Sequence, residues 1–245
     1  MTIPTYLPYY VLTGSVGIIA AILFGLHNGL VKADWPTYDR TSVVRTTAIV
    51  LIGWFAVAIV LAVLGAYHAD SDRIPTIQYG IFVPILVGGL LIWRSPSVRR
   101  VIDAVPQQWI VGVQAYRTLG VIFLILYATG RLPGLFAWPA GLGDVLVGVL
   151  APVVALAYVR LPHENANLVS LWNIFGLIDL VVAVSTGVLT SPSPVQLFAF
   201  DQPNELITVF PLVLIPVFLV PVSVLLHLIS LSKLYEPSPQ SQSEE

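Results

Sequence analysis

Seven long apolar runs constrain this chain more than any other feature of its sequence. Each run has roughly 20 or more mostly apolar positions, the length that a helix needs to cross the roughly 30 Å hydrocarbon core of a bilayer. Charged residues make up 10% of the chain, whereas soluble domains carry about 25%. The runs are continuous, unlike the alternating ten-residue strands of membrane barrels. The sequence therefore predicts an all-α polytopic membrane protein, a bundle of about seven transmembrane helices.

The predicted spans lie at 7–31, 43–67, 75–94, 107–129, 134–159, 167–189 and 204–231. We expect one transmembrane domain over residues 1–235, followed by a disordered polar tail at 236–245 that is rich in Pro and Ser. No Lys or Arg precedes the first run, so we expect a retained span and not a cleaved signal peptide. Between spans, residues 95–108 are predicted to form a short amphipathic surface helix, and residues 190–204 an outer loop.

Basic residues are distributed unequally between the predicted loops. Eight lie on one side, against only Arg73 and Arg131 on the other: Lys32, Arg40, Arg45, Arg94, Arg99, Arg100, Arg160 and Lys233. Because basic loops stay in the cytoplasm, we expect a cytoplasmic carboxyl terminus and an external amino terminus. The stretches 132–148 and 170–183 resemble segments of bacterial membrane proteins, which implies a bacterial cytoplasmic membrane.

Three ionisable residues, Arg117, Asp144 and Asp179, fall near the middle of predicted spans. Each is roughly 15 to 18 Å along its helix, close to the midplane of the bilayer. A charge at that depth is costly and usually marks a functional site. Gln114 shares a helix face with Arg117, and Asn173 shares one with Asp179, so both belong to the predicted site.

The simplest arrangement is an ion pair between Arg117 and one of the two aspartates. The second carboxylate would then lack a full partner and take up a proton, as in a proton relay or a cation site. We expect Asp179 to be that residue, because Asn173 and Gly176 on its face provide polar lining and space. The alternative is a structural strut that locks three helices together without further chemistry.

Prolines recur in the last predicted span, at Pro211, Pro216 and Pro221. Each removes a backbone donor and clashes with the carbonyl four residues earlier, so this helix should be kinked or locally unwound. Carbonyls freed in this way can bind cations or substrate where they face a cavity. They can equally be satisfied by neighbouring side chains in a curved helix.

Histidines suggest a different function. His27 and His227 are predicted near the cytoplasmic ends of the first and last spans, where two imidazoles could hold a b-type haem. A histidine at a helix end is more often an interfacial or capping residue. His68 and His163 belong to opposite sides of the membrane, so we expect no metal site.

Composition and motifs exclude several classes of function. The chain has no cysteine and a net charge of −2, which removes thiolate chemistry and gives no basic surface for nucleic acid. Both lysines lie outside the spans, so no retinal linkage can form. No catalytic motif is present, which favours a protein that is not an enzyme.

Three functions remain open. The first is a small-solute or ion transporter with a carboxylate site for a proton or cation. The second is a haem-binding or quinone-linked redox protein, and the third is a non-catalytic partner subunit, in a homo-oligomer or with another membrane protein. The lipid bilayer is the expected surrounding in all three.

Overall fold

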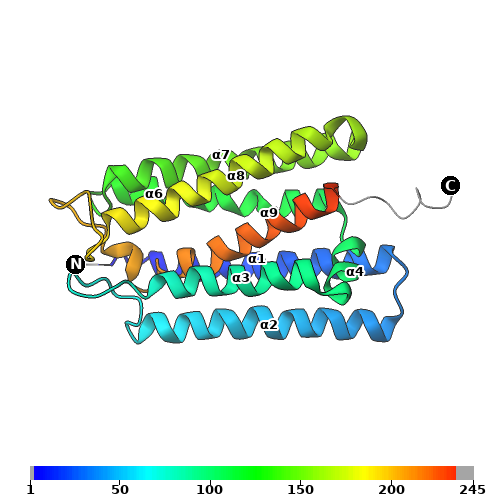
Figure 1. Ribbon diagram of the computed structural model, residues 1–245, viewed down its shortest axis with the longest axis horizontal. Helices are drawn as coiled ribbons and strands as arrows, with labels where there is room; N and C mark the ends of the chain where they lie inside the picture. Colours follow the sequence, from blue (N-terminus) through cyan, green and yellow to red (C-terminus); the bar gives the residue numbers. More distant parts are fainter. Residues whose placement is uncertain (1–2, 236–245) are drawn as a thin grey trace.

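The computed structural model describes residues 3–235, and its regular structure over that range is entirely helical (Figure 1). Seven helical stretches are long and apolar enough to cross a membrane: α1 Leu7–Lys32, α2 Thr37–Val63, α3 Ile77–Arg94, the stretch Gln107–Ala128, α7 Gly134–Arg160, α8 Pro162–Thr190 and the stretch Ile215–Tyr235. The prediction of an all-helical bundle with seven long apolar helices is confirmed. The tail predicted at 236–245 lies outside the described residues.

Two of the seven stretches are not uniform α-helices. Gln107–Ala128 comprises α5 Gln107–Gly112, the 3-10 helix η1 Val113–Gly120 and α6 Val121–Ala128. Ile215–Tyr235 comprises a π-helical turn, η3 Ile215–Leu219, followed by α9 Val220–Tyr235. Such interruptions of the α-helical pattern are frequent at functional sites.

The start of the last helix differs from the prediction. Residues 204–214 were expected to be helical, but they contain only the short 3-10 turn η2 Leu206–Thr208 and irregular backbone before Ile215. Pro211 lies in this irregular part and Pro216 in the π-helical turn, and each lacks a backbone donor. The predicted local unwinding is confirmed, and the predicted helix start is wrong.

The boundaries of α2 also shift from the predicted 43–67. The helix begins at Thr37, directly after Pro36, whose extended backbone breaks the preceding chain. It ends at Val63, two residues before Gly65, which adopts a left-handed conformation with φ +73°. That conformation favours glycine, so Gly65 ends the helix.

The amphipathic helix predicted within 95–108 is present as α4 Pro96–Ala104. Its first turn is capped by the Ser95 hydroxyl, which accepts a hydrogen bond from the Val98 amide at 3.3 Å. At its other end the Lys233 ammonium donates to the carbonyls of Ile102 and Asp103, at 2.9 and 3.0 Å. α4 is therefore held at both ends, and its second anchor comes from α9.

The helices form a bundle in which α2 is outermost (Figure 1). In that view α7 and α8 lie on one side, and α1, α3 and α9 separate them from α2. The η3 residue Phe218 is buried and packs against the rings of Trp54 and Phe55 of α2, with centroid distances of 4.8 Å. This apolar contact joins α2 to η3, and α2 also packs along α1.

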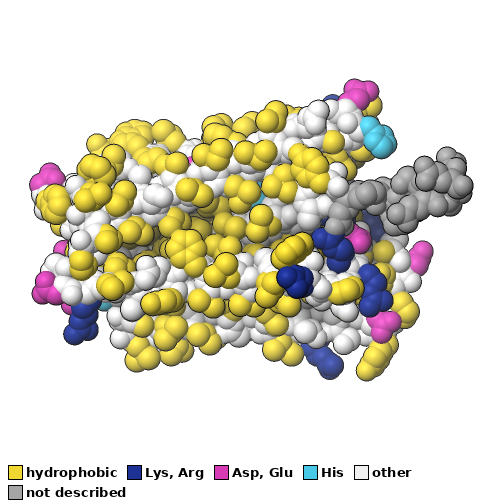
Figure 2. Space-filling model, in the orientation of Figure 1, with side chains coloured by type: hydrophobic (Ala, Val, Ile, Leu, Met, Phe, Trp, Pro, Cys, Tyr) yellow, Lys and Arg dark blue, Asp and Glu magenta, His cyan; other side chains and the backbone are white. Residues whose placement is uncertain are grey.

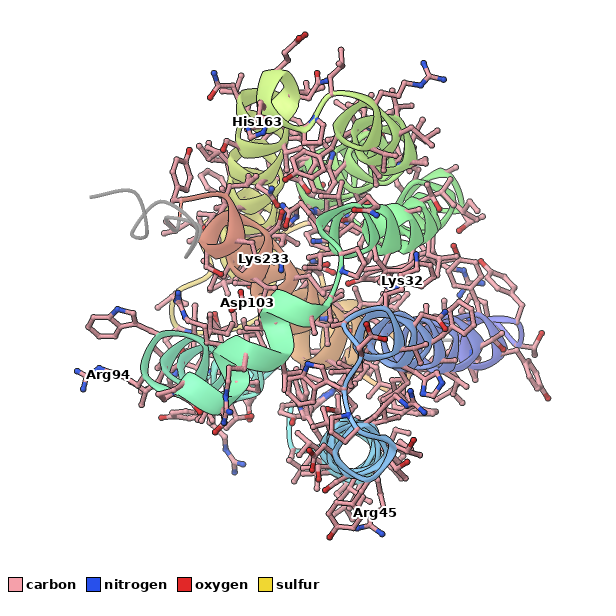
Figure 3. All side chains as sticks on the ribbon, turned by 90° about the vertical axis from the view of Figure 1, so that its right-hand side faces the viewer. Lys32, Arg45, Arg94, Asp103, His163 and Lys233 are labelled. Atoms are coloured by element: carbon pink, nitrogen blue, oxygen red, sulfur yellow. The ribbon has the colours of Figure 1, made fainter. Side chains whose placement is uncertain are left out.

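Charged side chains gather at the two ends of the bundle, while hydrophobic side chains cover most of the long face in Figure 2. The basic end is the end that carries Lys32, Arg94 and Lys233, which Figure 3 views directly. The acidic end is formed by residues 64–76, 129–133 and 191–205. This separation agrees with the alternation of loops along the sequence.

Candidate functional site: a charged cluster inside the bundle

Arg117, Asp144 and Asp179 meet inside the bundle, from η1, α7 and α8. The Arg117 Nε and Nη2 atoms each lie 2.7 Å from Asp144 Oδ1. The same Nη2 also donates to Asp179 Oδ2. Their side chains are 1%, 16% and 7% exposed, respectively. The prediction that Arg117 pairs with only one aspartate is therefore wrong, because the planar guanidinium presents five donors and engages both carboxylates.

His227 of α9 is the fourth member of this charged cluster, and it is fully buried. Its Nε2 lies 3.1 Å from Arg117 Nη1, and its Nδ1 lies 2.8 Å from Asn173 Oδ1. Arginine only donates, so Nε2 accepts and Nδ1 carries the proton that is donated to Asn173. Arg117 Nη1 also donates to the carbonyl of Gly176 at 3.3 Å. These contacts fix the imidazole as the neutral Nδ1–H tautomer.

Hydrogen bonds continue from Asn173 toward the basic end. Asn173 Nδ2 donates to Ser230 Oγ at 2.8 Å, and Gln107 Nε2 donates to the same oxygen at 2.7 Å. All three residues are buried. The amide of Asn173 cannot pass a proton onward in its ordinary form, so this series of contacts positions His227 and Arg117 and does not form a proton path.

Gln114 lies beside the cluster, and its side chain bonds to the backbone of α9 instead of to a charged group. It is 1% exposed and its Nε2 donates to the Ser223 carbonyl of α9 at 3.2 Å. Its Oε1 has no hydrogen-bond partner among the described residues. Nearby, the Tyr116 hydroxyl donates to the Leu219 carbonyl at 2.9 Å and contacts the Ser223 hydroxyl. Of the predicted site residues, Asn173 thus joins the cluster, and Gln114 lies next to it.

Three glycines provide the space that the cluster occupies. A Cβ atom on Gly143 would lie 1.6 Å from Asp179 Oδ1, and one on Gly120 would lie 2.3 Å from the Asp144 Cβ. A Cβ on Gly176 would lie 2.5 Å from His227 Nε2. Each distance is far below van der Waals contact. The missing side chains let η1, α7, α8 and α9 approach closely around Arg117.

Two cavities meet at Asp144. The first, of about 60 Å³, extends from Asp144 to Tyr67, Ser191 and Thr208 at the acidic end, and its other walls are mainly apolar. The second, of about 30 Å³, is bordered by Arg117 and Asp144 together with the hydroxyls of Tyr10, Tyr116 and Ser223. Each is large enough for water, since one molecule needs about 10–15 Å³ of such volume.

Asp179 does not border either of these two cavities. It is also less exposed than Asp144. The sequence favoured Asp179 as the accessible carboxylate, but the geometry favours Asp144. Both carboxylates are partners of Arg117, and Asp179 is the more buried of the two.

The charges of the cluster do not balance. One guanidinium faces two carboxylates, and His227 is neutral, so the ionised cluster has a net charge of −1. A buried excess charge is costly, and one proton or one monovalent cation at the open side of Asp144 would remove it. The described residues contain no group of three or more His, Cys, Asp or Glu that could hold a metal ion.

The two histidines considered as haem ligands are not equivalent. His27 is exposed on α1, whereas His227 is buried with both ring nitrogens hydrogen-bonded. Ligation of iron by His227 would break its contact with Arg117 or with Asn173. The geometry therefore gives no support to a haem site, and it moves His227 from the helix end, where the sequence put it, to the level of Arg117.

One protein family matches most of the chain. Residues 74–235 match the family described as Domain of unknown function (DUF8737). The matched region runs from the segment before α3 to the end of α9, and so it contains every residue of the charged cluster. No curated protein and no solved structure matches the chain.

Proposed function

We propose that this chain, which belongs to the DUF8737 family, is a membrane transporter that binds a proton or a small monovalent cation at Asp144. One observation carries the proposal: a buried cluster with an excess negative charge is connected to one end of the bundle by a cavity. Ionisable groups of this kind inside membrane proteins commonly mark ion or proton pathways. The transported solute is a small molecule or ion.

The surroundings that we propose are a bacterial cytoplasmic membrane, crossed seven times. The seven apolar helices and the basic end support this placement, because the positive-inside rule puts the basic end in the cytoplasm. The acidic end and the first cavity then face the outside. Asp144 in this conformation is accessible from the outer side.

Binding at Asp144 would redistribute the contacts of Arg117. When the carboxylate of Asp144 is charged and free of a ligand, Arg117 neutralises only part of the two negative charges. A proton or cation that arrives through the first cavity makes the cluster neutral, and Asp179 then becomes the full counter-ion of Arg117. Asn173 and His227 hold the guanidinium in position during this exchange.

A hydrophobic carbodiimide tests whether Asp144 is such a site, since the reagent modifies protonated carboxyl groups in apolar surroundings. Purified protein in detergent should be labelled at Asp144 and not at Asp179, as measured by mass spectrometry of peptides. Labelling should fall as the pH rises and as Na⁺ or K⁺ is added, if the cation competes. Asp72, an exposed carboxylate at the acidic end, is the matched control.

Proteoliposomes then test transport. A pH-sensitive dye inside vesicles should report proton movement when Na⁺ or K⁺ is added outside, and the Asp144→Asn variant should reduce the rate at least tenfold. The Asp72→Asn variant should keep the wild-type rate. If Asp144 is neither labelled nor required for proton movement, the cluster is a structural strut.

Orientation is tested separately with a reporter that is active only outside the cytoplasm. The acidic-end loop contains Pro192, and the basic end contains Lys233. Fusion after Pro192 should give an active reporter, and fusion after Lys233 a silent one. Activity at both positions, or after Lys233 alone, would rule out the proposed seven-span orientation.

A further inference from the structure

A third cavity, of about 160 Å³, lies beneath α4 at the basic end and is larger than either cavity at Asp144. Val101 and Ile102 of α4, with Val105 directly after it, form its roof. Aliphatic residues of α1, α5 and α9 form most of the remaining wall, together with Trp109 and Thr47. The charged cluster does not border this cavity, so it belongs to neither the proposed proton site nor its entrance.

The lining excludes water as a stable occupant. A buried water molecule needs two to four polar partners, and Thr47 and Trp109 are the only lining residues with a polar side-chain atom. An apolar cavity without such partners is filled by an apolar molecule or stays dry. Any molecule that fills this cavity must therefore place a hydrocarbon part in it.

The basic residues of α4 favour an occupant that also carries a negative charge. The helix directs its apolar side into the cavity and carries Arg99 and Arg100 on its remaining surface, where Arg100 is exposed. Arg94 precedes it at the same end of the bundle and packs over the ring of Trp93, 4.6 Å from the centroid (Figure 3). A basic helix that roofs an apolar cavity suits a molecule with a hydrocarbon body and an anionic end.

The wall on the α2 side consists of one side chain. α2 contributes one lining side chain, Thr47, and the buried part of α2 packs on α1 and on η3. Most of the α2 surface is exposed, as expected for a helix in contact with lipid. Entry from the surrounding leaflet is therefore easiest beside Thr47.

We propose that this cavity binds one acyl chain of an anionic phospholipid from the leaflet at the basic end, with its phosphate near Arg100. The apolar lining accepts the chain, and the charge of α4 selects the headgroup. Phosphate contacts of this kind are common where basic residues flank a membrane helix on the cytoplasmic side. The proposal does not depend on the transport function of Asp144.

Trp109 provides a reporter inside the cavity, because brominated acyl chains quench tryptophan fluorescence on contact. The protein is reconstituted in phosphatidylcholine vesicles that contain an equal fraction of either brominated phosphatidylglycerol or brominated phosphatidylcholine. The contribution of Trp109 is the difference between the wild type and Trp109→Phe. That substitution removes no protein hydrogen bond, because Trp109 Nε1 has no partner among the described residues.

Brominated phosphatidylglycerol should quench the Trp109 emission at least twofold more strongly than brominated phosphatidylcholine. Thr47→Phe, which fills the cavity, should abolish the quenching by both lipids. Arg100→Gln should leave the quenching but bring the ratio between the two lipids close to one. Arg160→Gln is the matched control, since Arg160 is also exposed but lies at the end of α7 and does not line this cavity.

Two outcomes would overturn the proposal. Equal quenching by both lipids in the wild type would mean that α4 does not select an anionic headgroup. Quenching that is absent, or that Thr47→Phe leaves unchanged, would mean that no acyl chain enters the cavity. Mass spectrometry of co-purified lipid is an independent readout if Trp109→Phe folds poorly: phosphatidylglycerol should remain bound to the wild type and be lost from the Thr47→Phe, Arg100→Gln double variant.

Discussion

α2 and the stretch Gln107–Ala128 are both long and apolar enough to cross a membrane, but they differ in internal structure. α2 is a continuous α-helix, and 17% of its most apolar window is buried. In Gln107–Ala128, 44% of the window is buried, and a 3-10 segment around Arg117 interrupts the helix. An exposed apolar helix must satisfy its own backbone groups, whereas a helix surrounded by protein can pair irregular backbone and charged side chains with neighbouring helices.

The two regions also use glycine differently. In α2, a Cβ atom on Gly53 would meet no atom within 4 Å. Around Gln107–Ala128, Gly120, Gly143 and Gly176 all lie where a Cβ would collide with the cluster. A side chain at Gly53 would therefore meet no obstacle, whereas the three glycines around the cluster leave no room for one. Three pairs of substitutions, each with one change in the interior and one in α2, test this contrast.

Arg117→Gln should lower the free energy of unfolding by about 3–5 kcal/mol, because it leaves two buried carboxylates without their counter-ion. Arg45→Gln, at an exposed position of α2, should change it by less than about 0.5 kcal/mol. Denaturant unfolding in detergent micelles measures both. Adding Asp144→Asn and Asp179→Asn to Arg117→Gln should restore much of the loss, and a failure of this rescue would argue against the ion pairs.

Gly143→Ala should destabilise the protein by about 3 kcal/mol, since the added methyl group overlaps Asp179 Oδ1 and forces the cluster apart. Gly53→Ala should instead stabilise α2 by about 0.5–1 kcal/mol, because alanine is the better helix former. Thermal unfolding of the two variants gives the sign of each change. A Gly143→Ala variant as stable as the wild type would show that the helices are not as closely packed at Gly143 as the geometry requires.

Asn173→Leu should cost about 1–3 kcal/mol, because it keeps the volume of the side chain but leaves the buried His227 Nδ1–H without an acceptor. Thr46→Leu, at an exposed position of α2, is the matched polar-to-apolar change and should be nearly neutral. The difference in unfolding free energy between the two variants measures the contribution of buried polar contacts. Equal values would mean that the His227–Asn173 contact adds nothing to stability.

Much of this arrangement follows from the sequence. The apolar runs specify seven helices, because a helix that crosses a bilayer must be long and predominantly apolar. The positions of Arg117, Asp144 and Asp179 along their runs predict a common depth, and the helical period puts Asn173 on the face of Asp179. The structure brings all four residues together.

Other parts of the site depend on details that periodicity does not contain. The sequence predicts a last span over 204–231 with His227 near its end, whereas the helical stretch runs from Ile215 to Tyr235 and places His227 away from both ends. Hydropathy alone does not distinguish irregular apolar backbone from helix. Which carboxylate borders a cavity also depends on side-chain packing across α7 and α8, so the choice between Asp144 and Asp179 required three-dimensional contacts.

The Lys233 contacts with the end of α4 have a mechanical consequence. α9 carries His227 in the charged cluster and, in its final turn, the ammonium that holds the carbonyls of Ile102 and Asp103. Lys233 and Asp103 lie next to each other where α9 meets α4 in Figure 3. Any displacement of α4 relative to α9 must either break these two hydrogen bonds or move the helix that positions the imidazole beside Arg117.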